Sequence, residues 1–383
     1  MNIYLLGATG SIGTQTLDVI REYPDHFSLR ACSLGHIMER NIEIIDEFMP
    51  KAVCARTSED ARFLQQRYPE ISVFYGDEGL VKVATYDKDK KGIMLNALIG
   101  SLGLVPTVEA IKIGRDIAIA NKETLVTAGE IVTSLAKQYG VRLLPVDSEH
   151  SAISQCLNGE NHCEIKRLII TASGGAFRDK KRSELENVTK ADALAHPNWN
   201  MGAKITIDSA TMMNKGFEVI EAHWLFDVPY DQIDTIMHRE SIIHSMVEFQ
   251  DSSIMAQLGT PDMRIPIIHA LGNPMRLKYQ SPLDLLKVRK MHFEELSMNR
   301  FPCLKMAIEA GKKGGIYPTV LNAANEAAVK LFLEDKITFL EIEEIIKEEL
   351  NKSWQMDNPS LEDIIRVDLA VKENVLRKYG GLK

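Results

Sequence analysis

The chain has 383 residues, about two to three times the length of a typical domain, so we expect two or three domains with a large core. Its 45% hydrophobic and 26% charged residues are typical of a folded globular protein and exclude a disordered or collagen-like chain. The net charge of −8, from 45 basic and 53 acidic residues, argues against a protein that binds the nucleic-acid backbone. A small anionic substrate is compatible with this charge.

The cysteines and the apolar runs indicate where the protein works. Five cysteines occur without a C-x-x-C pair, which argues against a secreted disulfide framework and against a zinc ribbon. No apolar run approaches the ~18 residues of a membrane span, and the first residues lack a basic segment followed by a long apolar one. We therefore expect reduced thiols, no membrane contact and a cytoplasmic location.

Residues 1–146 alternate short apolar runs with amphipathic stretches. The expected strands are Asn2–Leu6, Ser28–Ser33, Ala52–Cys54, Gly92–Ala97, Asp116–Ile119 and Arg142–Val146. The expected helices are Thr14–Arg21, Asn41–Phe48, Glu59–Arg67, Pro106–Ile113 and Leu125–Gln138. Strands that alternate with helices are typical of a parallel sheet, so we predict a Rossmann-like, doubly wound α/β domain.

The pattern changes after this domain. The expected strands of a second, α+β catalytic domain over residues 147–272 are Ile165–Ala172, Lys204–Ile207, Asp234–Met237, Ser241–Phe249 and Ile254–Leu258. Only four polar residues separate the last two strands, which predicts a hairpin. Residues 273–299 contain two prolines and indicate a linker. Residues 300–383 are predicted to be helical, with Pro318 opening one helix and Ser360 capping the last.

A glycine-rich turn, Gly7-Ala8-Thr9-Gly10-Ser11-Ile12-Gly13, directly follows the first strand and opens the first helix. Glycines at this place permit a tight turn and let backbone N–H groups approach a pyrophosphate at the helix N-terminus. The spacing is G-x-x-G-x-x-G rather than G-x-G-x-x-G, and a turn without any nucleotide would use the same residues. Dinucleotide binding and a purely structural turn both stay open at this point.

Three carboxylates form a candidate metal site. Asp147 and Glu149 follow the strand Arg142–Val146, and residues two apart in an extended chain face the same side. Glu218 lies on an expected helix, on the face that also carries positions 214 and 215. Three carboxylates are the hard oxygen donors that suit Mg²⁺ or Mn²⁺. Solvated surface charges are the alternative, because nothing in the local sequence links Glu218 to the other two.

Hydroxyl, amide and lysine side chains form a candidate phosphate site. Ser173 follows a strand and precedes Gly174-Gly175, a sequence that suits an anion-binding nest of backbone N–H groups. Ser209, Asn214 and Lys215, near a helix start, supply hydrogen bonds and one cation. Each of these residues alone would serve equally well as a cap or a surface residue.

Residues 173–202 form a candidate lid. The segment is mostly polar, has glycines near both ends and carries Trp199, and such hinges with an aromatic tip are features of a segment that closes over a ligand. A surface loop whose tryptophan packs locally is the alternative. Asn121-Lys122-Glu123 follows another strand, at the sheet edge where ligands bind in this architecture, although a helix cap would look the same.

Six segments in this order resemble the 1-deoxy-D-xylulose 5-phosphate reductoisomerase family over essentially the whole chain. They are Gly7 to Gly13, Ala120-Asn121-Lys122-Glu123, Val146 to Ala152, Ser173-Gly174-Gly175, His196-Pro197-Asn198-Trp199 and Ser209 to Glu218. The resemblance implies a homodimer. Each chain would have an NADPH-binding domain (1–146), a catalytic domain (147–272), a linker (273–299) and a C-terminal helical domain (300–383).

The resemblance also implies the residues of the site. NADPH would be held by Thr9, Gly10, Ser11, Ile12, Gly35, His36, Asn121, Glu123 and Gly202. One Mn²⁺, Mg²⁺ or Co²⁺ ion would be held by Asp147, Glu149 and Glu218. The phosphorylated sugar would be held by Lys122, Ser148, Glu149, Ser173, His196, Trp199, Ser209, Asn214, Lys215 and Glu218. The catalytic candidates are Lys122, Glu149, His150 and His196.

The implied activity is the reductive isomerisation of a phosphorylated sugar. The family converts 1-deoxy-D-xylulose 5-phosphate into a branched aldehyde and reduces it with NADPH to 2-C-methyl-D-erythritol 4-phosphate, in non-mevalonate isoprenoid biosynthesis. The metal supplies Lewis acidity at the ketone, and closure of the lid excludes water. Two other classes stay open: a nicotinamide dehydrogenase without a metal, and a noncatalytic dinucleotide-sensing protein.

The chain departs from the family after its second strand. The family usually has Gly, then Lys or Arg, then Asn, whereas this chain has Gly35-His36-Ile37. The basic residue suited to the 2′-phosphate is missing, and neither position 36 nor 37 is acidic, as a contact to the ribose hydroxyls of NADH would require. We therefore expect a retained but narrowed preference for NADPH, with His36 and, one helical turn further on, Arg40 as the candidate contacts.

Overall fold

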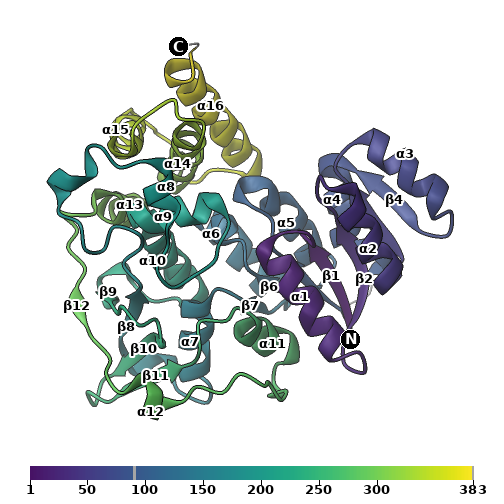
Figure 1. The fold of residues 1–383 in the computed structure, drawn as a ribbon, viewed down its shortest axis with the longest axis horizontal. Helices are drawn as coiled ribbons and strands as arrows, with labels where there is room; N and C mark the ends of the chain where they lie inside the picture. Colours follow the sequence, from purple (N-terminus) through teal and green to yellow (C-terminus); the bar gives the residue numbers. More distant parts are fainter. Residues whose placement is uncertain (89–91, 382–383) are drawn as a thin grey trace. The chain divides into compact units, whose positions relative to one another are not determined.

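The computed structural model describes residues 1–88 and 92–381, and the chain forms two compact units (Figure 1). Unit 1 contains Met1–Thr124, Glu130–Ser151 and Asp262–Gln280. Unit 2 contains Leu125–Gly129, Ala152–Pro261 and the chain from Ser281 onward. The chain therefore leaves unit 1 and returns to it before it ends in unit 2.

Unit 1 is built on a seven-stranded sheet with the order β4-β3-β2-β1-β5-β6-β7, in which every pairing is parallel. The strands are β1 (Asn2–Leu6), β2 (Ser28–Ser33), β3 (Ala52–Ala55), β4 (Ser72–Tyr75), β5 (Ile93–Asn96), β6 (Asp116–Ile119) and β7 (Leu143–Pro145). The sheet confirms the prediction of a doubly wound parallel fold. Strand β4 was not predicted, because it is a short edge strand that is only partly buried and so lacks a continuous apolar run.

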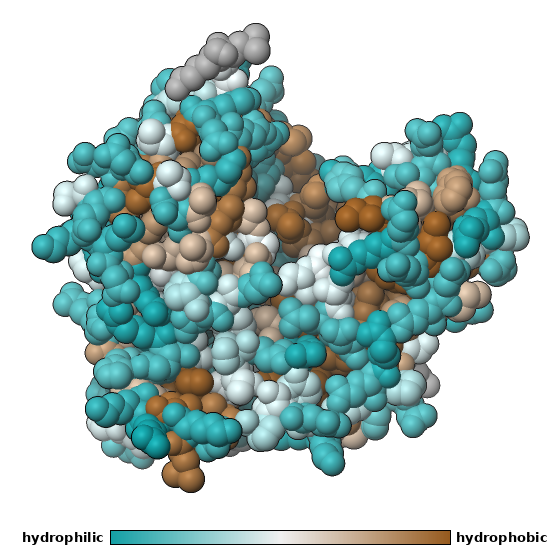
Figure 2. All heavy atoms as spheres, in the orientation of Figure 1, coloured by the Kyte–Doolittle hydropathy of each residue, from teal (hydrophilic) through white to brown (hydrophobic). Residues whose placement is uncertain are grey.

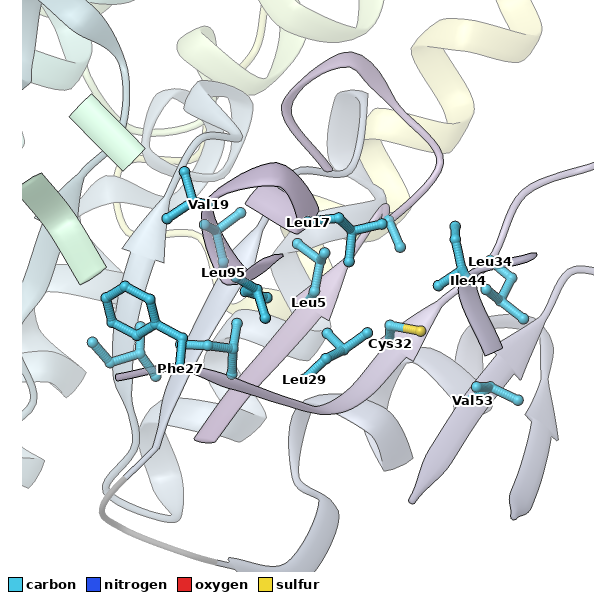
Figure 3. Packing of buried hydrophobic residues seen from close by; sticks show 14 of the residues in the cluster. Leu5, Leu17, Val19, Phe27, Leu29, Cys32, Leu34, Ile44, Val53 and Leu95 are labelled. Atoms are coloured by element: carbon cyan, nitrogen blue, oxygen red, sulfur yellow. The ribbon is translucent and has the colours of Figure 1, made fainter. Parts of the chain in front are cut away.

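One helix follows each of the first six strands, as expected for right-handed β-α-β crossovers. These helices are α1 (Ser11–Glu22), α2 (Met38–Phe48), α3 (Ser58–Arg67), α4 (Gly76–Ala84), α5 (Leu104–Lys112) and α6 (Lys122–Tyr139), and β7 leads into α7 (Ser148–Cys156). Figure 3 shows Leu17 of α1 beside Leu5 of β1, and Ile44 of α2 beside Leu34 and near Val53 of β3. Full burial of each such side chain contributes about 1.5–3 kcal/mol, so this cluster fixes the carboxyl ends of β1 and β2.

Helix α11 (Arg264–Gly272) also packs in unit 1, against α1. Ile267, Ile268 and Leu271 belong to the same buried cluster as the central strands. From the sequence, this segment is expected in the catalytic domain and the residues after it in a linker. The division into functional domains stays a prediction. The division into compact units places residues 262–280 in unit 1, with the parallel sheet.

Unit 2 contains a five-stranded mixed sheet with the order β11-β10-β8-β9-β12. Its strands are β8 (Ile165–Ala172), β9 (Ile233–Met237), β10 (Ile243–Phe249), β11 (Ile254–Leu258) and β12 (Glu294–Glu295). β8 and β9 pair in parallel, whereas β10 runs antiparallel to both β8 and β11. The predicted hairpin is therefore confirmed, and so is the α+β character of this part of the chain.

The helices of unit 2 cover this sheet and form a C-terminal helical layer. They are α8 (Lys190–Leu194), α9 (Ala203–Thr211), α10 (Met213–Phe226), α12 (Leu285–Val288), α13 (Pro302–Lys313), α14 (Tyr317–Leu333), α15 (Phe339–Leu350) and α16 (Leu361–Tyr379). α14 packs against both α15 and α16, and Ser360 caps α16 through a reciprocal pair with Asp363, as predicted. Among the described residues, no helix is both long and apolar enough to cross a membrane.

One predicted strand is wrong. Lys204–Ile207 lies in helix α9, because a short apolar run with β-branched residues has the same pattern in a buried helix as in a buried strand. Thr206 and Ile207 are buried, and the helix ends where Met212 adopts a left-handed conformation with φ of 61°. That kink separates α9 from α10 and turns the start of α10 toward the end of β8.

Candidate active site

The glycine turn of unit 1 is set by contacts that only glycine permits. Gly7 has φ of 89°, and its N–H donates to Ser33 Oγ at 2.7 Å. A Cβ atom on Gly13 would lie 2.0 Å from the Gly7 carbonyl oxygen. Helix α1 therefore begins tightly against the end of β1; of the predicted pyrophosphate contacts, Thr9 and Gly10 lie in the turn, and Ser11 and Ile12 are the first two residues of α1.

A second group of predicted residues lies at the carboxyl ends of β6 and β7. Asn121 is buried, and its side-chain amide donates to the carbonyls of Leu98 and Gly100, both at 2.9 Å, and to Glu123 Oε2 at 3.0 Å. Its side chain therefore fixes the loop that follows β5. Glu123 is 7% exposed and also turned inward, so both residues shape this edge of the sheet.

Asp147 and Lys122 form an ion pair in unit 1, with Lys122 Nζ 2.6 Å from Asp147 Oδ2 and both side chains largely buried. Glu149 Oε2 accepts a hydrogen bond from Ser148 Oγ at 2.6 Å. The extended geometry assumed for Asp147 and Glu149 is wrong, since α7 begins at Ser148 directly after Asp147. Glu149 instead stands in the first turn of a helix, and the next residue, His150, is fully buried.

Unit 2 holds the other predicted charges on the first turns of α10. Glu218 is 1% exposed and pairs with Lys215 Nζ and with the side-chain amide of Asn214. The three residues therefore share one helical face, as predicted. Lys215 Nζ also donates to the carbonyl oxygen of Thr171, near the end of β8. The lysine thus joins α10 to the strand end that precedes Ser173.

The loop after β8 folds against the last turn of α9. Gly174 and Gly175 both have positive φ, 87° and 66°, and a Cβ atom on Gly175 would lie 2.5 Å from the carbonyl oxygen of Ser209. Ser173, Ser209 and Lys215 thus come from three neighbouring chain segments of unit 2. Ser209 lies inside α9 and is mostly buried, so it is not a cap for α10.

His196 connects the predicted lid to Ser173. Its Nδ1 accepts from the backbone N–H groups of Asn198 at 3.1 Å and Trp199 at 2.9 Å, and its Nε2 lies 3.1 Å from Ser173 Oγ. Because Nδ1 accepts two hydrogen bonds, the ring proton belongs on Nε2, where it donates to Ser173. Burial, and then the charge of Arg178, lower the pKa of His196 to about 4.

Contacts that the sequence did not predict hold the tip of this loop. The Asn198 amide donates to the carbonyl of Arg239 at 2.7 Å and to Ser241 Oγ at 3.2 Å. Arg178 donates to Asn198 Oδ1 at 3.2 Å and to the same Arg239 carbonyl at 3.1 Å. Trp199 lies beside His244, with 6.2 Å between ring centroids. The sequence gives no signal for this network, since its two halves are about 40 residues apart and the acceptors are backbone or short polar groups.

The first part of the predicted lid is fixed to the rest of unit 2. Phe177 is 1% exposed and packs edge-on against Phe339, with centroids 4.9 Å apart. Arg182 pairs with Glu343 of α15, and Lys190 pairs with Asp335 at 2.5 Å. Residues 177–194 are therefore anchored to the C-terminal helices, whereas hydrogen bonds of His196 and Asn198 join the following segment to Ser173, Arg239 and Ser241.

The predicted residues thus form one set in each unit. The unit 1 set consists of Thr9 to Ile12, Gly35, His36, Asn121, Lys122, Glu123, Asp147, Ser148, Glu149 and His150. The unit 2 set consists of Ser173, His196, Trp199, Gly202, Ser209, Asn214, Lys215 and Glu218. The joint role of Asp147, Glu149 and Glu218 at one metal ion stays a prediction.

A glycine turn on a parallel sheet, with buried charged and hydroxyl groups elsewhere in the chain, is typical of dinucleotide-dependent oxidoreductases. The family model "1-deoxy-D-xylulose 5-phosphate reductoisomerase" matches residues 3–129. The models of that family's C-terminal domain and of the "DXP reductoisomerase C-terminal domain" match residues 143–226 and 258–374. The chain belongs to the 1-deoxy-D-xylulose 5-phosphate reductoisomerase family.

Relatives and solved structures agree with this assignment. The chain is 55% identical to 1-deoxy-D-xylulose 5-phosphate reductoisomerase 2 of Bacillus thuringiensis, over 98% of this chain and 99% of the relative. It is 58% identical to the reductoisomerase of Halalkalibacterium halodurans over 96% of both chains. The NADPH complex of the Zymomonas mobilis enzyme superposes with a TM-score of 0.91 at 39% identity, covering 100% of this chain and 99% of that one. A complex of DOX-P reductoisomerase with NADPH, fosmidomycin and magnesium has a TM-score of 0.93 at 38% identity, covering 99% and 98%.

The depressed pKa of His196 predicts how stability changes with pH. The unfolded chain takes up a proton at this ring near pH 6.5 and the folded chain only near pH 4. Since the unfolded state binds more protons between these values, the free energy of unfolding attributable to His196 falls as the pH is lowered from about 7 to 4. Urea unfolding of wild type and His196→Gln at several pH values measures this difference.

The control for this experiment is His162→Gln, at an exposed histidine outside the site. We expect the pH-dependent difference for His196→Gln only. Nitrogen NMR of the His196 ring at pH 6 should find a neutral ring with its proton on Nε2. A protonated ring at that pH, or identical pH profiles for the two variants, would contradict the assignment.

Proposed function

We propose that the chain catalyses the metal-dependent isomerisation and NADPH-dependent reduction of 1-deoxy-D-xylulose 5-phosphate to 2-C-methyl-D-erythritol 4-phosphate, a step of non-mevalonate isoprenoid biosynthesis. Membership of the reductoisomerase family over nearly the whole chain carries this proposal. Solved members of the family, which are bound to NADPH, fosmidomycin and magnesium, support the choice of cofactor and metal. The direct test is NADPH oxidation with this substrate, with and without EDTA and added Mn²⁺.

The donor chemistry of the chain fits a divalent cation. Asp147, Glu149 and Glu218 are oxygen donors, which Mg²⁺ and Mn²⁺ prefer. Lys215, which compensates Glu218, is also the proposed partner of the substrate phosphate. If the substrate phosphate binds the Lys215 ammonium group, the Glu218 carboxylate needs another cation to compensate its charge, and a metal ion would supply it. The proposed phosphate site and the proposed metal site are therefore chemically compatible. When bound, the ion would supply Lewis acidity at the ketone and the neighbouring hydroxyl of the substrate.

The residues of unit 2 would bind and orient the substrate phosphate. Lys215 supplies the cation, and Ser209, Asn214 and the Ser173 hydroxyl supply hydrogen bonds. The neutral His196 ring donates its Nε2 proton to Ser173 and so orients that hydroxyl. Because His196 adds no charge, we expect affinity for the phosphate to depend mainly on Lys215.

The residues of unit 1 would bind the cofactor and complete the reaction site. The glycine turn and the N-terminus of α1 would hold the pyrophosphate through backbone N–H groups. Lys122, held by Asp147, would contact the substrate beside the nicotinamide. The overall reaction is balanced by one hydride from NADPH and one proton from solvent, which together reduce the rearranged aldehyde to an alcohol.

A metal-independent dehydrogenase with a nucleophilic cysteine fits the chain less well. Burial raises the pKa of Cys32 and Cys54 to about 12 and that of Cys156 to about 11. Cys303 is fully buried and its pKa is raised as well, so these four thiols are poor nucleophiles. The remaining cysteine, Cys163, is exposed and lies outside both sets of site residues.

We expect Glu218→Gln to abolish turnover while NADPH binding stays nearly unchanged. The substitution removes a charged oxygen donor, and we expect a loss of at least about 100-fold, larger than for residues that merely orient a metal ligand. Steady-state NADPH oxidation in Mg²⁺ or Mn²⁺, together with fluorescence titration of NADPH, measures both quantities. Glu373→Gln, at an exposed position of α16, is the matched control. Near-normal activity of Glu218→Gln would refute the three-carboxylate site.

We propose that the lid within residues 173–202 moves mainly at residues 196–202. The ion pairs of residues 177–194 anchor the first part, whereas residues 196–199 are held by hydrogen bonds to the loops around Ser173 and Arg239, which opening would have to release, and Gly202, the N-cap of α9, has open space around it. Chymotryptic cleavage after Trp199 should be fast in the free enzyme and slow with a phosphonate hydroxamate and Mg²⁺. Such a ligand would fill the phosphate site and chelate the metal, closing the loop over its spacer. Equal cleavage with and without saturating ligand would argue against a lid.

We propose a homodimer, and the exposed edge of the unit 2 sheet supports it. β11 is an edge strand with Ile254 and Met255 exposed by 52% and 41%, and α12 exposes Leu286 by 85%. Figure 2 shows hydrophobic residues gathered at the end of unit 2 that carries β11 and α12. Sedimentation equilibrium should give about twice the 43.0 kDa of one chain, and the mass of a single chain would refute the dimer.

A cytoplasmic location stays part of the proposal, supported by the five free cysteines.

A further inference from the structure

The loop between β2 and α2 is fixed against the glycine turn. A Cβ atom on Gly35 would lie 2.2 Å from Thr9 Oγ1, so the two loops are in direct contact. The Gly35 N–H donates to Asn41 Oδ1 at 3.2 Å, and the Asn41 amide returns a bond to the Gly35 carbonyl at 2.9 Å. Asn41 is 1% exposed. The first turn of α2 is therefore held rigidly beside the turn that would hold the pyrophosphate, where the adenosine ribose lies in this architecture.

The arginines near the β2–α2 loop differ in whether their side chains are already paired with carboxylates. Arg21 of α1 is engaged by Glu47 at 2.5 Å and by Asp18 at 2.7 Å. Arg40, on the first turn of α2, is exposed, and its side chain makes no ion pair or hydrogen bond with any residue in the described parts of the chain. Arg40 and Ile37 line a groove of about 410 Å³ together with Thr14 of α1, the residue that follows the glycine turn. Arg40 is thus the available guanidinium of this groove.

Two other basic residues lie near the same edge. His36 is exposed and directly follows Gly35. Arg56 is exposed and follows β3, which is one strand further from β1 than β2 is. An arginine suits a phosphate better than a histidine, because its planar guanidinium always carries charge and donates two parallel hydrogen bonds. These comparisons favour Arg40 over both His36 and Arg56.

The same groove also carries acidic residues. Glu39 and Glu43 stand beside Arg40 on α2, and both line the groove. No acidic residue occurs between Ser33 and Met38, where a carboxylate would accept the ribose hydroxyls of NADH. Selection for NADPH must therefore come from a cation, and the two glutamates weaken the attraction of that cation for a phosphate.

We propose that Arg40 is the residue that selects NADPH over NADH, by binding the 2′-phosphate from the first turn of α2, and that Glu43 limits this selectivity. The inference rests on the proposed use of NADPH and names the specificity determinant of that site. The N-terminus of α2, an eleven-residue helix, adds its partial positive charge to that of Arg40. His36 contributes at most a secondary contact.

The test is cofactor affinity of the substrate-free enzyme, measured by fluorescence titration rather than by turnover. For Arg40→Gln, the Kd for NADPH should rise about 10- to 100-fold, which corresponds to one charge-assisted contact, while the Kd for NADH stays within about twofold. Arg40→Lys should keep part of the NADPH affinity. Glu43→Gln should tighten NADPH and leave NADH unchanged.

Arg21→Gln and Arg56→Gln are matched controls, since each removes a guanidinium near the same edge, and His36→Gln tests the competing histidine. We expect all three to leave the ratio of the two Kd values within about threefold of wild type. Adenosine 2′,5′-bisphosphate serves as a probe of the phosphate contact alone, and Arg40→Gln should weaken its binding as it weakens NADPH.

The outcomes distinguish a failure of the proposed function from a failure of the role of Arg40. Wild-type enzyme that binds neither NADPH nor NADH would refute the proposed function together with this inference. Normal NADPH binding by wild type and an unchanged Kd in Arg40→Gln would refute the role of Arg40 alone, as would a larger loss in His36→Gln or Arg56→Gln. An equal loss of NADPH and NADH in Arg40→Gln, with a lowered melting temperature, would also overturn it, since selectivity would then be untouched.

Discussion

Compensation of buried carboxylates is the constraint on which the candidate site depends. Glu218 is almost fully buried and pairs with Lys215, and Asp147 pairs with Lys122. Removing one partner of a buried pair costs about 3–5 kcal/mol, because the remaining charge is left without compensation. Each lysine therefore compensates a carboxylate in the free protein and is proposed to bind the substrate in the complex. Affinity for an anionic substrate and stability of the ligand-free chain are consequently linked through the same ammonium groups.

Close approaches at three glycines position loops of both units. In unit 1, Gly13 brings α1 against the glycine turn and Gly35 brings the β2–α2 loop against Thr9. In unit 2, Gly175 brings the loop after β8 against the carbonyl of Ser209. A Cβ atom would lie 2.0 Å from a backbone oxygen at Gly13 and 2.5 Å from one at Gly175, so a larger residue there would have to displace the facing backbone. At Gly35 it would lie 2.2 Å from Thr9 Oγ1 and would have to turn that side chain. In both units, the proposed ligand-binding loops thus depend on a glycine that lies in close contact with a neighbouring segment.

The sequence predicts the parts of the fold that follow from short-range patterns. The alternation of strands and helices predicts the parallel sheet, and the helical spacing of Asn214, Lys215 and Glu218 correctly places them on one face. Lys204–Ile207 is mispredicted because burial, not local pattern, decides between helix and strand there. The geometry of Glu149 is mispredicted because α7 begins at Ser148, so Glu149 lies in a helix and not in an extended segment. The contacts of Asn198 with Arg239 and Ser241 depend on tertiary packing alone, so no sequence pattern reveals them.

The neutral His196 ring shows how such tertiary contacts can govern chemistry. Its Nδ1 accepts hydrogen bonds from the backbone N–H groups of residues 198 and 199, and its Nε2–H donates a hydrogen bond to Ser173 Oγ. Both ring nitrogens therefore hold neighbouring groups in place. A ring protonated at both nitrogens could not accept these two backbone hydrogen bonds and would place a positive charge beside Ser173. The burial that lowers the pKa of His196 therefore preserves the loop geometry and keeps the ring beside Ser173 uncharged. Loop conformation, hydroxyl orientation and the charge of the site are thereby controlled by the protonation state of one side chain.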